Sequence, residues 1–583
     1  MPRIPVRSLQ TAAGVVAVTI LLWWSSLPST KTIVFPFNSR ATNVVIPSTI
    51  NSSWPERAEQ SRAAFLRAYH AYEEHAFPAD ELLPESEEGS KHLNGWGLTT
   101  IDSLDTMYLM GFKPEFKRAR EHVKKLDMTA TDKFIPFFET TIRYLGGLIA
   151  AYVLTSDQLF LTKAEELAQI LLPAFDTGSG LPQFQVNPST RASKAGPQKH
   201  KASFSEIASF SLEFQTLAIL TGKEEYALPV GKLLDILETT PTENGLWPTT
   251  WELASGKPQG FALAVGGNAD SAYEYLLKLY MNSHSAKIAR DMYIRAANGI
   301  IKTLIYISPY RHLMYATDIP NYKTGIPSNK FEHLTCFLPG LLALGVHSLH
   351  EHLSLRERRT HMYAAEGLAQ TCWLLYADST SGLGPDEVVF SRWPSPPAGG
   401  GGPDAGKGER DLGRWVDALA EWERGAVRWR KGGIWGKHEQ ADKLPPGVRN
   451  VEPVPGRPNE RDYWLRRPEH LLRPEVVESL YLLWKTTGDA KWREKGWQVC
   501  NAFDGHSRTP VAYSTLRRID QVPVRWTDSM PSWFLAETLK YCFLLASDKD
   551  LVPLDRYTLN TEGHLMPQFA WEGWKKFKVQ GSS

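Results

Sequence analysis

The chain has 583 residues, and its 65 Lys and Arg against 64 Asp and Glu give a formal charge of +1. This balance argues against a polycationic nucleic-acid-binding protein, so we expect no nucleic-acid partner. Apolar residues make up 42% of the chain and charged residues 22%, a composition that excludes global disorder and can build a large packed core. Four cysteines are too few for a disulfide-scaffolded fold and leave room for one or two disulfides or none.

The N-terminal segment has the pattern of a membrane-insertion signal. Residues 12–27 are mostly apolar and follow two arginines, Arg3 and Arg7. Because basic residues favour the cytosolic side, we predict a cytosolic tail at residues 1–10 and a signal-anchor transmembrane helix at 11–30. No small-x-small cleavage site follows, which favours a retained type II anchor. A cleaved signal peptide is the alternative, since the apolar stretch is short for a full span.

The next segment, residues 31–53, is predicted to be a lumenal stem. It is rich in Ser, Thr and Pro and ends with the glycosylation sequon Asn51-Ser52-Ser53. Whether anchored or cleaved, the N-terminal segment directs the rest of the chain into the secretory pathway. We therefore expect the protein in the ER or Golgi membrane, with residues 54–583 in the lumen.

The body of the chain is predicted to be mainly α-helical, because apolar residues recur at helical spacing and strand-like alternation is scarce. A turn pattern recurs at residues 154–160, 220–226 and 486–492: Gly or Ser after one helix, an acid at the start of the next, and then an aromatic. Such turns join antiparallel helices into αα-hairpins. Repeated hairpins without a strict short period indicate a helical toroid; unrelated hairpins in a multi-domain helical protein are the alternative.

Residues 391–462 are interpreted as an insertion into this pattern. Pro394 to Arg410 is rich in Pro and Gly and predicts a flexible surface linker. After it, Trp415, Trp422 and Trp429 are spaced seven residues apart, so a helix over 411–431 would place the three rings on one face. We expect that face to dock on the main body; contact with a membrane surface or a partner is the alternative, which the nearby arginines would suit.

Several acids lie in otherwise apolar helical segments, where an ionised carboxylate is costly unless it is paired or functional. The candidates are Glu139, Asp270, Glu475, Glu478, Glu537 and Glu562. Five of the six have an ordinary structural explanation. Glu139 can form an i,i+4 salt bridge with Arg143, Asp270 can cap a helix, Glu475 and Glu478 can complement a helix dipole, and Lys540 can neutralise Glu537.

Together, the same acids permit catalysis. Helix termini that bring carboxylates into the centre of a toroid can pair a general acid with a general base acting on water, which is the arrangement used in glycoside hydrolysis. Carboxylates gathered beside a Thr oxygen also suit a hard cation such as Ca²⁺, and the chain has no Cys/His spacing typical of zinc.

A set of ordered motifs makes the resemblance specific. The chain contains NGWGLTTIDSLDTM at 94–107, FETTIRYLGG at 138–147, DSAYEYLLK at 270–278, HLTCFLPGLLALG at 333–345, LRPEVVES at 472–479, FLAETLKY at 534–541 and NTEGH at 560–564. From about Asp80 to His564, with the insertion left out, it closely resembles the class I α-1,2-mannosidases of glycoside hydrolase family 47. This resemblance implies an all-α, (αα)7 barrel over residues 54–583. It also implies a monomeric, Ca²⁺-dependent, inverting exo-mannosidase that trims high-mannose N-glycans of glycoproteins.

The resemblance also implies residue roles. Glu139 matches the general acid, Glu475 the general base that activates the attacking water, and Asp270 a further essential acid. Thr561 matches the Ca²⁺ ligand, through its hydroxyl and carbonyl oxygens. The residues that match substrate-contacting or water-holding positions are Arg143, Asn268, His333, Arg473, Glu478, Trp533, Glu537 and Glu562. Cys336 and Cys372 match the family's disulfide, which leaves Cys500 and Cys542 as expected core thiols.

Two departures from the family pattern bear on function. Asp386 stands where many members carry Glu in the acid machinery, and Asn268 stands where Arg or Leu helps to select the mannose that is removed. A lectin-like factor of the same fold, acting in ER-associated degradation of misfolded glycoproteins without efficient hydrolysis, is the alternative function. The segment from His333 to Phe337 argues against it, because such factors usually lack this segment. A helical scaffold and a different αα-barrel glycosidase have no support from these motifs.

Overall fold

The computed structural model of the chain describes residues 52–394, 411–425, 428–429, 436–437 and 444–569. The predicted tail, anchor, most of the stem, Asn51 of the sequon and most of the linker lie outside these residues. No helix within the described ranges is long and apolar enough to cross a membrane.

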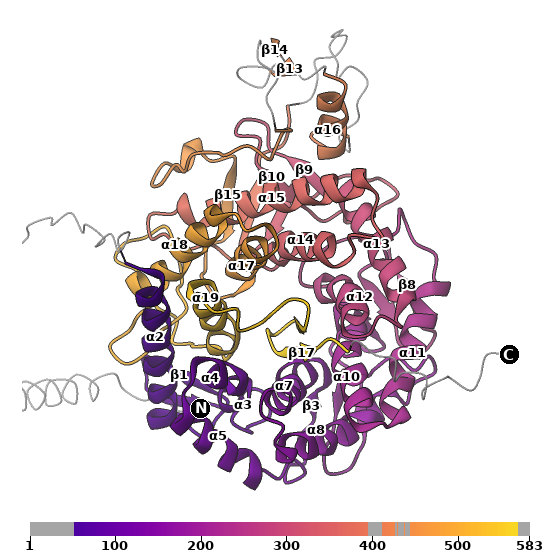
Figure 1. The fold of residues 1–583 in the computed structure, drawn as a ribbon. Coiled ribbons are helices and arrows are strands. Elements are labelled where there is room, and N and C mark those ends of the chain that lie inside the picture. The colour runs from indigo at the N-terminus through magenta and orange to yellow at the C-terminus, as the bar shows by residue number, and fades with distance from the viewer. Residues whose placement is uncertain (1–51, 395–410, 426–427, 430–435, 438–443, 570–583) are drawn as a thin grey trace, which may run out of the picture. The chain divides into compact units, whose positions relative to one another are not determined.

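Two concentric rings of helices form the fold (Figure 1). The outer ring contains α2 (Trp54–His75), α5 (Lys113–Lys125), α8 (Gln158–Leu171), α11 (Glu224–Thr239), α13 (Lys287–Thr303), α15 (Leu355–Ala377) and α18 (Ala490–His506). The inner ring contains α4 (Leu104–Met110), α7 (Gly146–Thr155), α10 (Ser211–Thr221), α12 (Asp270–Asn282), α14 (Leu338–Ser348), α17 (Glu475–Thr487) and α19 (Leu539–Ala546). Each inner helix packs against an outer helix adjacent in the chain, except that α19 packs against α2 and closes the ring. The predicted all-α barrel is confirmed, and unrelated hairpins are excluded.

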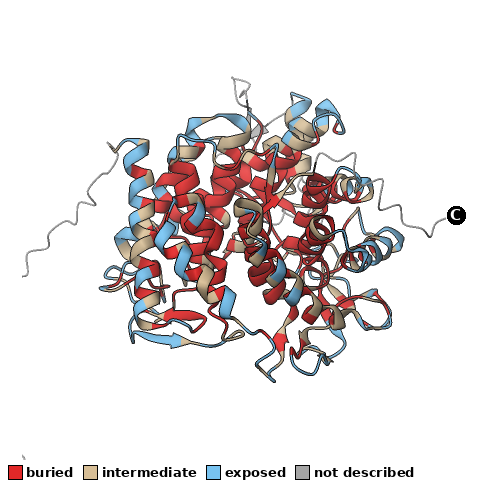
Figure 2. Cartoon of the chain, turned by 60° about the horizontal axis from the view of Figure 1, so that its bottom comes forward, coloured by how far each residue is buried: buried red, intermediate tan, exposed pale blue. Residues whose placement is uncertain are grey.

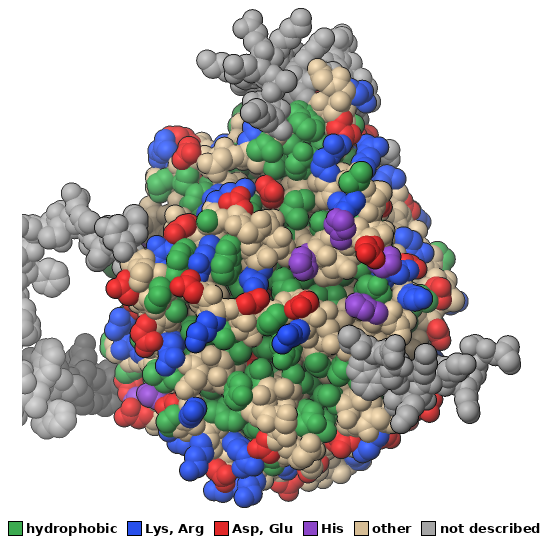
Figure 3. All heavy atoms as spheres, in the orientation of Figure 1, with side chains coloured by type: hydrophobic (Ala, Val, Ile, Leu, Met, Phe, Trp, Pro, Cys, Tyr) green, Lys and Arg blue, Asp and Glu red, His purple; other side chains and the backbone are tan. Residues whose placement is uncertain are grey.

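The burial of the two rings follows from their sequences (Figure 2). The outer helix α11 buries a single stripe of side chains, namely Tyr226, Val230, Leu233 and Leu237, which is typical of an amphipathic helix on a core. The inner helix α12 is buried at every position from Ser271 to Asn282, because it has neighbours on all sides. On the face shown in Figure 3, Lys and Arg are interspersed with Asp and Glu, in keeping with the balanced charge.

The three predicted αα-hairpin turns are confirmed. Ser156, Gly222 and Gly488 have φ angles of 58°, 73° and 71° and end α7, α10 and α17, respectively. This left-handed conformation terminates a helix. Asp157 and Asp489 then cap α8 and α18 by accepting hydrogen bonds from backbone N–H groups two residues on, which releases the chain in the antiparallel direction.

The strands are short and all their pairings are antiparallel. They are β1 (Glu81–Leu83) with β2 (Glu88–Ser90), β3 (Ile135–Pro136) with β4 (Gln185–Val186) and β5 (Ser193–Lys194), β6 (Lys201–Ser203) with β7 (Thr250–Glu252) and β8 (Lys257–Gln259), β9 (Ile305–Ile307) with β10 (Met314–Ala316), β11 (Lys330–Glu332) with β12 (Glu387–Phe390) and β15 (Tyr463–Arg467), β13 (Arg428–Trp429) with β14 (Gly436–Lys437), and β16 (Tyr557–Leu559) with β17 (Leu565–Pro567). The β16–β17 hairpin lies inside the ring and contacts α7, α10 and α12 (Figure 1). Its turn, residues 560–564, is thereby placed in the barrel interior.

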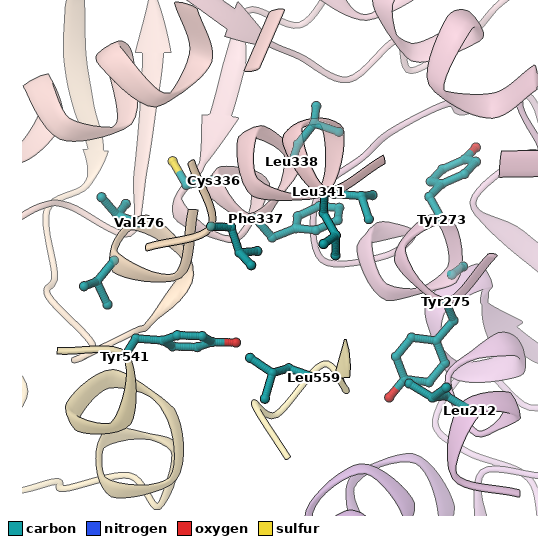
Figure 4. Close-up of a cluster of buried hydrophobic side chains, with 14 of the residues drawn as sticks. Leu212, Tyr273, Tyr275, Cys336, Phe337, Leu338, Leu341, Val476, Tyr541 and Leu559 are labelled. Carbon is teal, nitrogen blue, oxygen red and sulfur yellow. The ribbon is translucent and has the colours of Figure 1, made fainter. Parts of the chain in front are cut away.

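Shorter helices complete the fold. They are α3 (Leu98–Asp102), α6 (Phe137–Glu139), α9 (Phe204–Ala208), α16 (Trp415–Glu423), the 3₁₀ turns η4 (Leu172–Phe175), η5 (His333–Phe337) and η6 (Pro458–Glu460), and the π-helical turns η3 (Thr140–Leu145) and η7 (Phe534–Thr538). Inner-wall side chains and Leu559 of the hairpin belong to one buried hydrophobic cluster (Figure 4).

The insertion departs from its helical prediction. It leaves the barrel between β12 and β15, which are neighbours in one sheet. Trp415 is buried in the main hydrophobic cluster, on a helix that contacts α13 and β9, and Trp422 packs edge-on against Tyr363 of α15. Docking of these two rings on the main body is therefore confirmed. A continuous helix over 411–431 is wrong: α16 ends at Glu423 and Trp429 lies in β13. Gly425, at φ 66°, takes a conformation that a continuing helix does not allow.

All four cysteines form disulfides. Cys336–Cys372 is confirmed, whereas the expectation of core thiols at Cys500 and Cys542 is wrong because these two residues are also bonded. The second bond joins neighbouring helices α18 and α19, which bring the two Cα atoms to 5.8 Å. Sequence spacing alone does not reveal this proximity.

We predict that the unfolded, unreduced protein contains no thiol that reacts with a thiol reagent. Replacing Cys500 and Cys542 together by Ala should lower the free energy of unfolding by about 4 kcal/mol. The reason is that the disulfide joins residues 42 positions apart and closes a loop that restricts the unfolded chain. The double Ala variant of Cys336 and Cys372 is the matched control and should lose a similar amount. Two reactive thiols per wild-type chain would contradict the second disulfide.

Candidate active site

A cavity of about 230 Å³ lies where the inner helices meet the hairpin turn. Its lining comprises Phe138, Glu139, Ile142, Arg143, Gly267, Asp270, Ser271, Glu274, Leu334, Phe337, Arg473, Pro474, Glu475, Glu478, Trp533, Glu537, Thr561 and Glu562. Ten of the thirteen non-cysteine residues that the sequence singles out are among them. The structure therefore brings together side chains that are up to 423 positions apart, from Glu139 to Glu562.

Helix starts and widened helical turns place these side chains. Asp270 and Glu475 are the first residues of α12 and α17, so both acids lie at helix ends that open on the cavity. Arg143 lies in the π-helical turn η3 and Glu537 in the π-helical turn η7. Such turns occur mostly as short segments and are frequent at functional sites.

Arg143 joins two acids that are distant in sequence. Its Nε lies 2.7 Å from Glu139 Oε2 and its Nη1 lies 2.9 Å from Glu562 Oε2. The predicted i,i+4 pair with Glu139 is thus present. Because the guanidinium is buried and also bridges to the hairpin turn, the pair belongs to the cavity floor rather than to the protein surface.

Glu475 is held in its ionised form. Burial alone would raise its pKa, but the hydrogen bond and charge of His333 and the charge of Arg473 outweigh burial and lower the pKa below its usual value. His333 Nδ1 lies 2.8 Å from Glu475 Oε2, and its Nε2 lies 2.7 Å from the hydroxyl of Tyr376. His333 does not line the cavity; it stands behind Glu475 and fixes it.

The pKa of Asp270 is shifted in the opposite direction from that of Glu475. Burial, reinforced by the charges of Glu274 and Glu332, raises the pKa of Asp270 to about 7, against the hydrogen bond that it accepts from the Ser271 N–H. It does not cap α12, since the N-cap position is Ala269. Near neutral pH the same cavity therefore offers one carboxyl that is partly protonated and one that is ionised, which is what paired acid and base catalysis requires.

Trp533 forms an aromatic wall of the cavity. Its ring has Arg143 at 5.2 Å and Arg473 at 5.5 Å from the centroid, and its indole N–H donates to the carbonyl of Leu471 at 3.0 Å. The two cations and the hydrogen bond fix the orientation of the ring.

The three remaining acids line the same cavity as Thr561. Burial first, and then the charge of neighbouring carboxylates, raises the pKa values of Glu478, Glu537 and Glu562, and the cations Lys278 and Arg143 offset this only in part. Such a concentration of oxygen donors and negative charge fits a hard divalent cation.

Thr561 itself is available as a ligand. Its backbone N–H donates to Tyr275 Oη at 3.3 Å, while its hydroxyl and carbonyl oxygens have no hydrogen-bond partner in the described part of the chain. Within the same residues, no three His, Cys, Asp or Glu side chains converge closely enough to ligate a metal directly. The donor set therefore fits a cation bound by Thr561 and by water that the carboxylates hold.

Two further predicted residues lie away from the cavity. Asn268 is exposed, next to the lining residue Gly267. Asp386 is buried, with Oδ1 at 2.9 Å from Arg473 Nε and Oδ2 at 2.8 Å from Arg467 Nη1. Both oxygens of Asp386 are therefore occupied by arginines, and its observed role is to hold Arg473 against the cavity.

The sequence analysis missed Glu274 and Lys278. Glu274 lines the cavity and forms a buried ion pair with Lys278. Both lie within the quoted motif at 270–278, four and eight residues after Asp270, so helical spacing would have placed them on the same face of α12. The apolar lining residues Leu334 and Phe337 carry no chemical signal that distinguishes them from core residues.

Comparisons with known proteins agree with this geometry. The model of glycosyl hydrolase family 47 matches residues 64–568. A mannosyl-oligosaccharide 1,2-alpha-mannosidase of Arabidopsis thaliana is 31% identical over 89% of this chain and 81% of its own length. An endoplasmic reticulum mannosyl-oligosaccharide 1,2-alpha-mannosidase of Homo sapiens is 34% identical over 86% of this chain and 63% of its own length. The solved structure of an alpha-1,2-mannosidase from Trichoderma reesei is 26% identical, with a TM-score of 0.72, over 88% of this chain and 99% of that chain.

Proposed function

We propose that this chain, which belongs to glycosyl hydrolase family 47, is an inverting exo-α-1,2-mannosidase that removes mannose from high-mannose N-glycans of glycoproteins. The observation that carries the proposal is the pair of carboxyls with opposed pKa shifts, Asp270 and Glu475, in one cavity with an aromatic wall. An inverting glycosidase needs a protonated carboxyl beside the leaving oxygen and an ionised one beside the attacking water.

In this proposal Glu475 takes a proton from the attacking water. His333 and Arg473 keep it ionised and fixed, and Asp386 in turn holds Arg473. The lowered pKa of Glu475 supports this base role, because the group is ionised across the neutral range.

Proton donation to the leaving sugar falls to the acids opposite the base. The family resemblance assigns it to Glu139, and the raised pKa supports Asp270 as the group that carries the proton near pH 7. Arg143 keeps the Glu139 carboxylate in place through the 2.7 Å contact. Trp533 offers a flat face for stacking on a mannose ring.

A Ca²⁺ ion is proposed to complete the site, with Thr561 as its protein ligand. When bound, the ion supplies positive charge that orients sugar hydroxyls. Glu478, Glu537 and Glu562 hold the surrounding water in this proposal, which the concentration of buried oxygen donors at Thr561 supports.

Placement in the cell follows from the N-terminal sequence and from the relatives. We propose a monomer anchored in the ER or Golgi membrane by residues 11–30, with the barrel in the lumen, where glycoproteins carry high-mannose glycans. The naming of the human relative for the endoplasmic reticulum supports a place in the secretory pathway.

The direct test is glycan profiling of a nine-mannose N-glycan incubated with the full-length protein. We expect stepwise loss of mannose in the presence of Ca²⁺ and none with excess chelator. Glu475→Gln should lower turnover by about 10²–10⁴-fold while glycan binding persists, because only proton transfer is lost. Glu460→Gln, at an exposed pair with Arg457, is the matched control and should trim at the wild-type rate. Binding without trimming by a folded, Ca²⁺-loaded wild type would contradict the proposal and favour the lectin-like alternative.

The second test is the pH dependence of kcat/KM. A base works when ionised, so activity falls as the pH drops through the pKa of Glu475; an acid works when protonated, so activity falls as the pH rises through about 7, the pKa of Asp270. His333→Phe removes a contact that lowers the pKa of Glu475, and the acid limb should therefore move to higher pH while the alkaline limb stays. His361→Phe, a buried histidine bonded to Asn298, is the control that should move neither limb. An unmoved acid limb in His333→Phe would contradict the assignment of the base.

A further inference from the structure

Two buried side chains beneath the hairpin turn have no part in the mechanism above. They are Tyr275 of α12 and Glu213 of α10, both almost completely excluded from solvent. The Tyr275 hydroxyl accepts the Thr561 N–H at 3.3 Å and donates to Glu213 Oε1 at 2.6 Å. Figure 4 shows Tyr275 in the same buried cluster as Leu559, the last residue of β16. A chain of two hydrogen bonds thus links the backbone of Thr561 to the inner wall of the barrel.

A second link reaches the same turn through Asn560. Its amide Nδ2 donates to Glu213 Oε1 at 2.8 Å and to the carbonyl of Ile142 at 2.9 Å. Its Oδ1 accepts the N–H groups of Glu562 and His564 at 2.9 and 2.8 Å. Glu213 Oε1 accepts in this arrangement, so it fixes which end of the Asn560 amide faces the wall and which end organises the turn.

All hydrogen bonds of the Glu213 side chain are made by one of its two oxygens. Its second oxygen, Oε2, is buried and has no hydrogen-bond partner in the described residues. A buried polar atom without a partner costs stability. The Oε1 atom, by contrast, accepts from both Tyr275 and Asn560. Tyr275 bonds the backbone N–H of Thr561, and Asn560 organises the turn through the N–H groups of Glu562 and His564.

We propose that Tyr275 and Glu213 are positioning residues that place the two free oxygens of Thr561 toward the cavity. The inference rests on the proposed function in one respect, since those oxygens are the ligands proposed for Ca²⁺. The hydroxyl of Tyr275 accepts a hydrogen bond from the backbone N–H of Thr561. Glu213 accepts hydrogen bonds from the Tyr275 hydroxyl and the side-chain amide of Asn560. Neither residue touches substrate or reacting atoms; they act through the turn.

The test compares two tyrosines of the same helix in the full-length protein. Tyr275→Phe removes the hydroxyl that holds Thr561, whereas Tyr273→Phe removes an equally buried hydroxyl whose contacts are the backbone of Trp247. We expect Tyr275→Phe to weaken Ca²⁺ binding, measured by calorimetry on chelator-stripped protein, by about tenfold, and to speed hydrogen exchange in residues 560–564. Tyr273→Phe should change the affinity by less than about twofold. Equal behaviour of the two variants would overturn the proposal.

Glu213 provides the second comparison. Glu213→Gln keeps an acceptor oxygen for Tyr275 and Asn560, and we expect it to retain Ca²⁺ affinity within about threefold; Glu213→Leu removes the acceptor and should lose about tenfold. Equal losses in both variants would contradict a role through hydrogen-bond acceptance. If the wild type binds no Ca²⁺, the proposed metal fails. Hydrogen exchange of residues 560–564 then decides the positioning role: it stands if only Tyr275→Phe speeds exchange, and fails if the two tyrosine variants match.

Discussion

The structure depends on cations and hydrogen bonds that compensate the negative charge of carboxylates buried inside the barrel. Ionised carboxylates away from water are tolerated only when cations or hydrogen bonds offset the loss of hydration. The compensating contacts are those of Arg143 with Glu139 and Glu562, Lys278 with Glu274, and Lys540 with Asp105. Arg143 thereby ties the inner wall to the hairpin turn, and Lys540 joins α19 to α4. Lys278 has its acidic partner in the same helix and also donates to the carbonyl of Asn560 in the turn. The ring of helices, the position of the turn and the shape of the cavity are therefore set by the same ion pairs.

The chemical properties of the cavity carboxyls depend on how fully nearby cations compensate their negative charge. His333 and Arg473 lie close to Glu475 and lower its pKa, whereas burial and the charges of Glu274 and Glu332 raise the pKa of Asp270 to about 7. Beside Thr561 the acids outnumber the cations, which is why an added divalent ion fits there. Differences in local charge thus give similar carboxyls in one cavity of about 230 Å³ opposite pKa shifts, and the proposed roles of base, acid and cation-holding group rest on these differences.

Sequence reasoning succeeded where a signal is local or repeated. The turns at Ser156, Gly222 and Gly488 and the Glu139–Arg143 pair follow from spacing and backbone preference. Contacts made only by the closed ring could not be predicted from the sequence: the Cys500–Cys542 bond joins helices whose adjacency no spacing encodes.

Most cavity residues were predicted from motif resemblance, which also marked His333 and Asp386 without revealing that they stand behind Glu475 and Arg473. Tyr275 and Glu213 look like ordinary core positions until the hairpin turn is placed above them.

In the proposed reaction an ionised carboxyl takes a proton from the attacking water while a protonated carboxyl donates to the leaving oxygen, in a single displacement at the anomeric carbon. The most direct measurement is proton NMR of the first mannose released from an α-1,2-linked mannobiose, recorded before the sugar equilibrates in solution. β-Mannose should appear first, with the α-anomer forming only by later mutarotation. Release of α-mannose first would contradict it, because retention requires a covalent intermediate on one of the carboxyls.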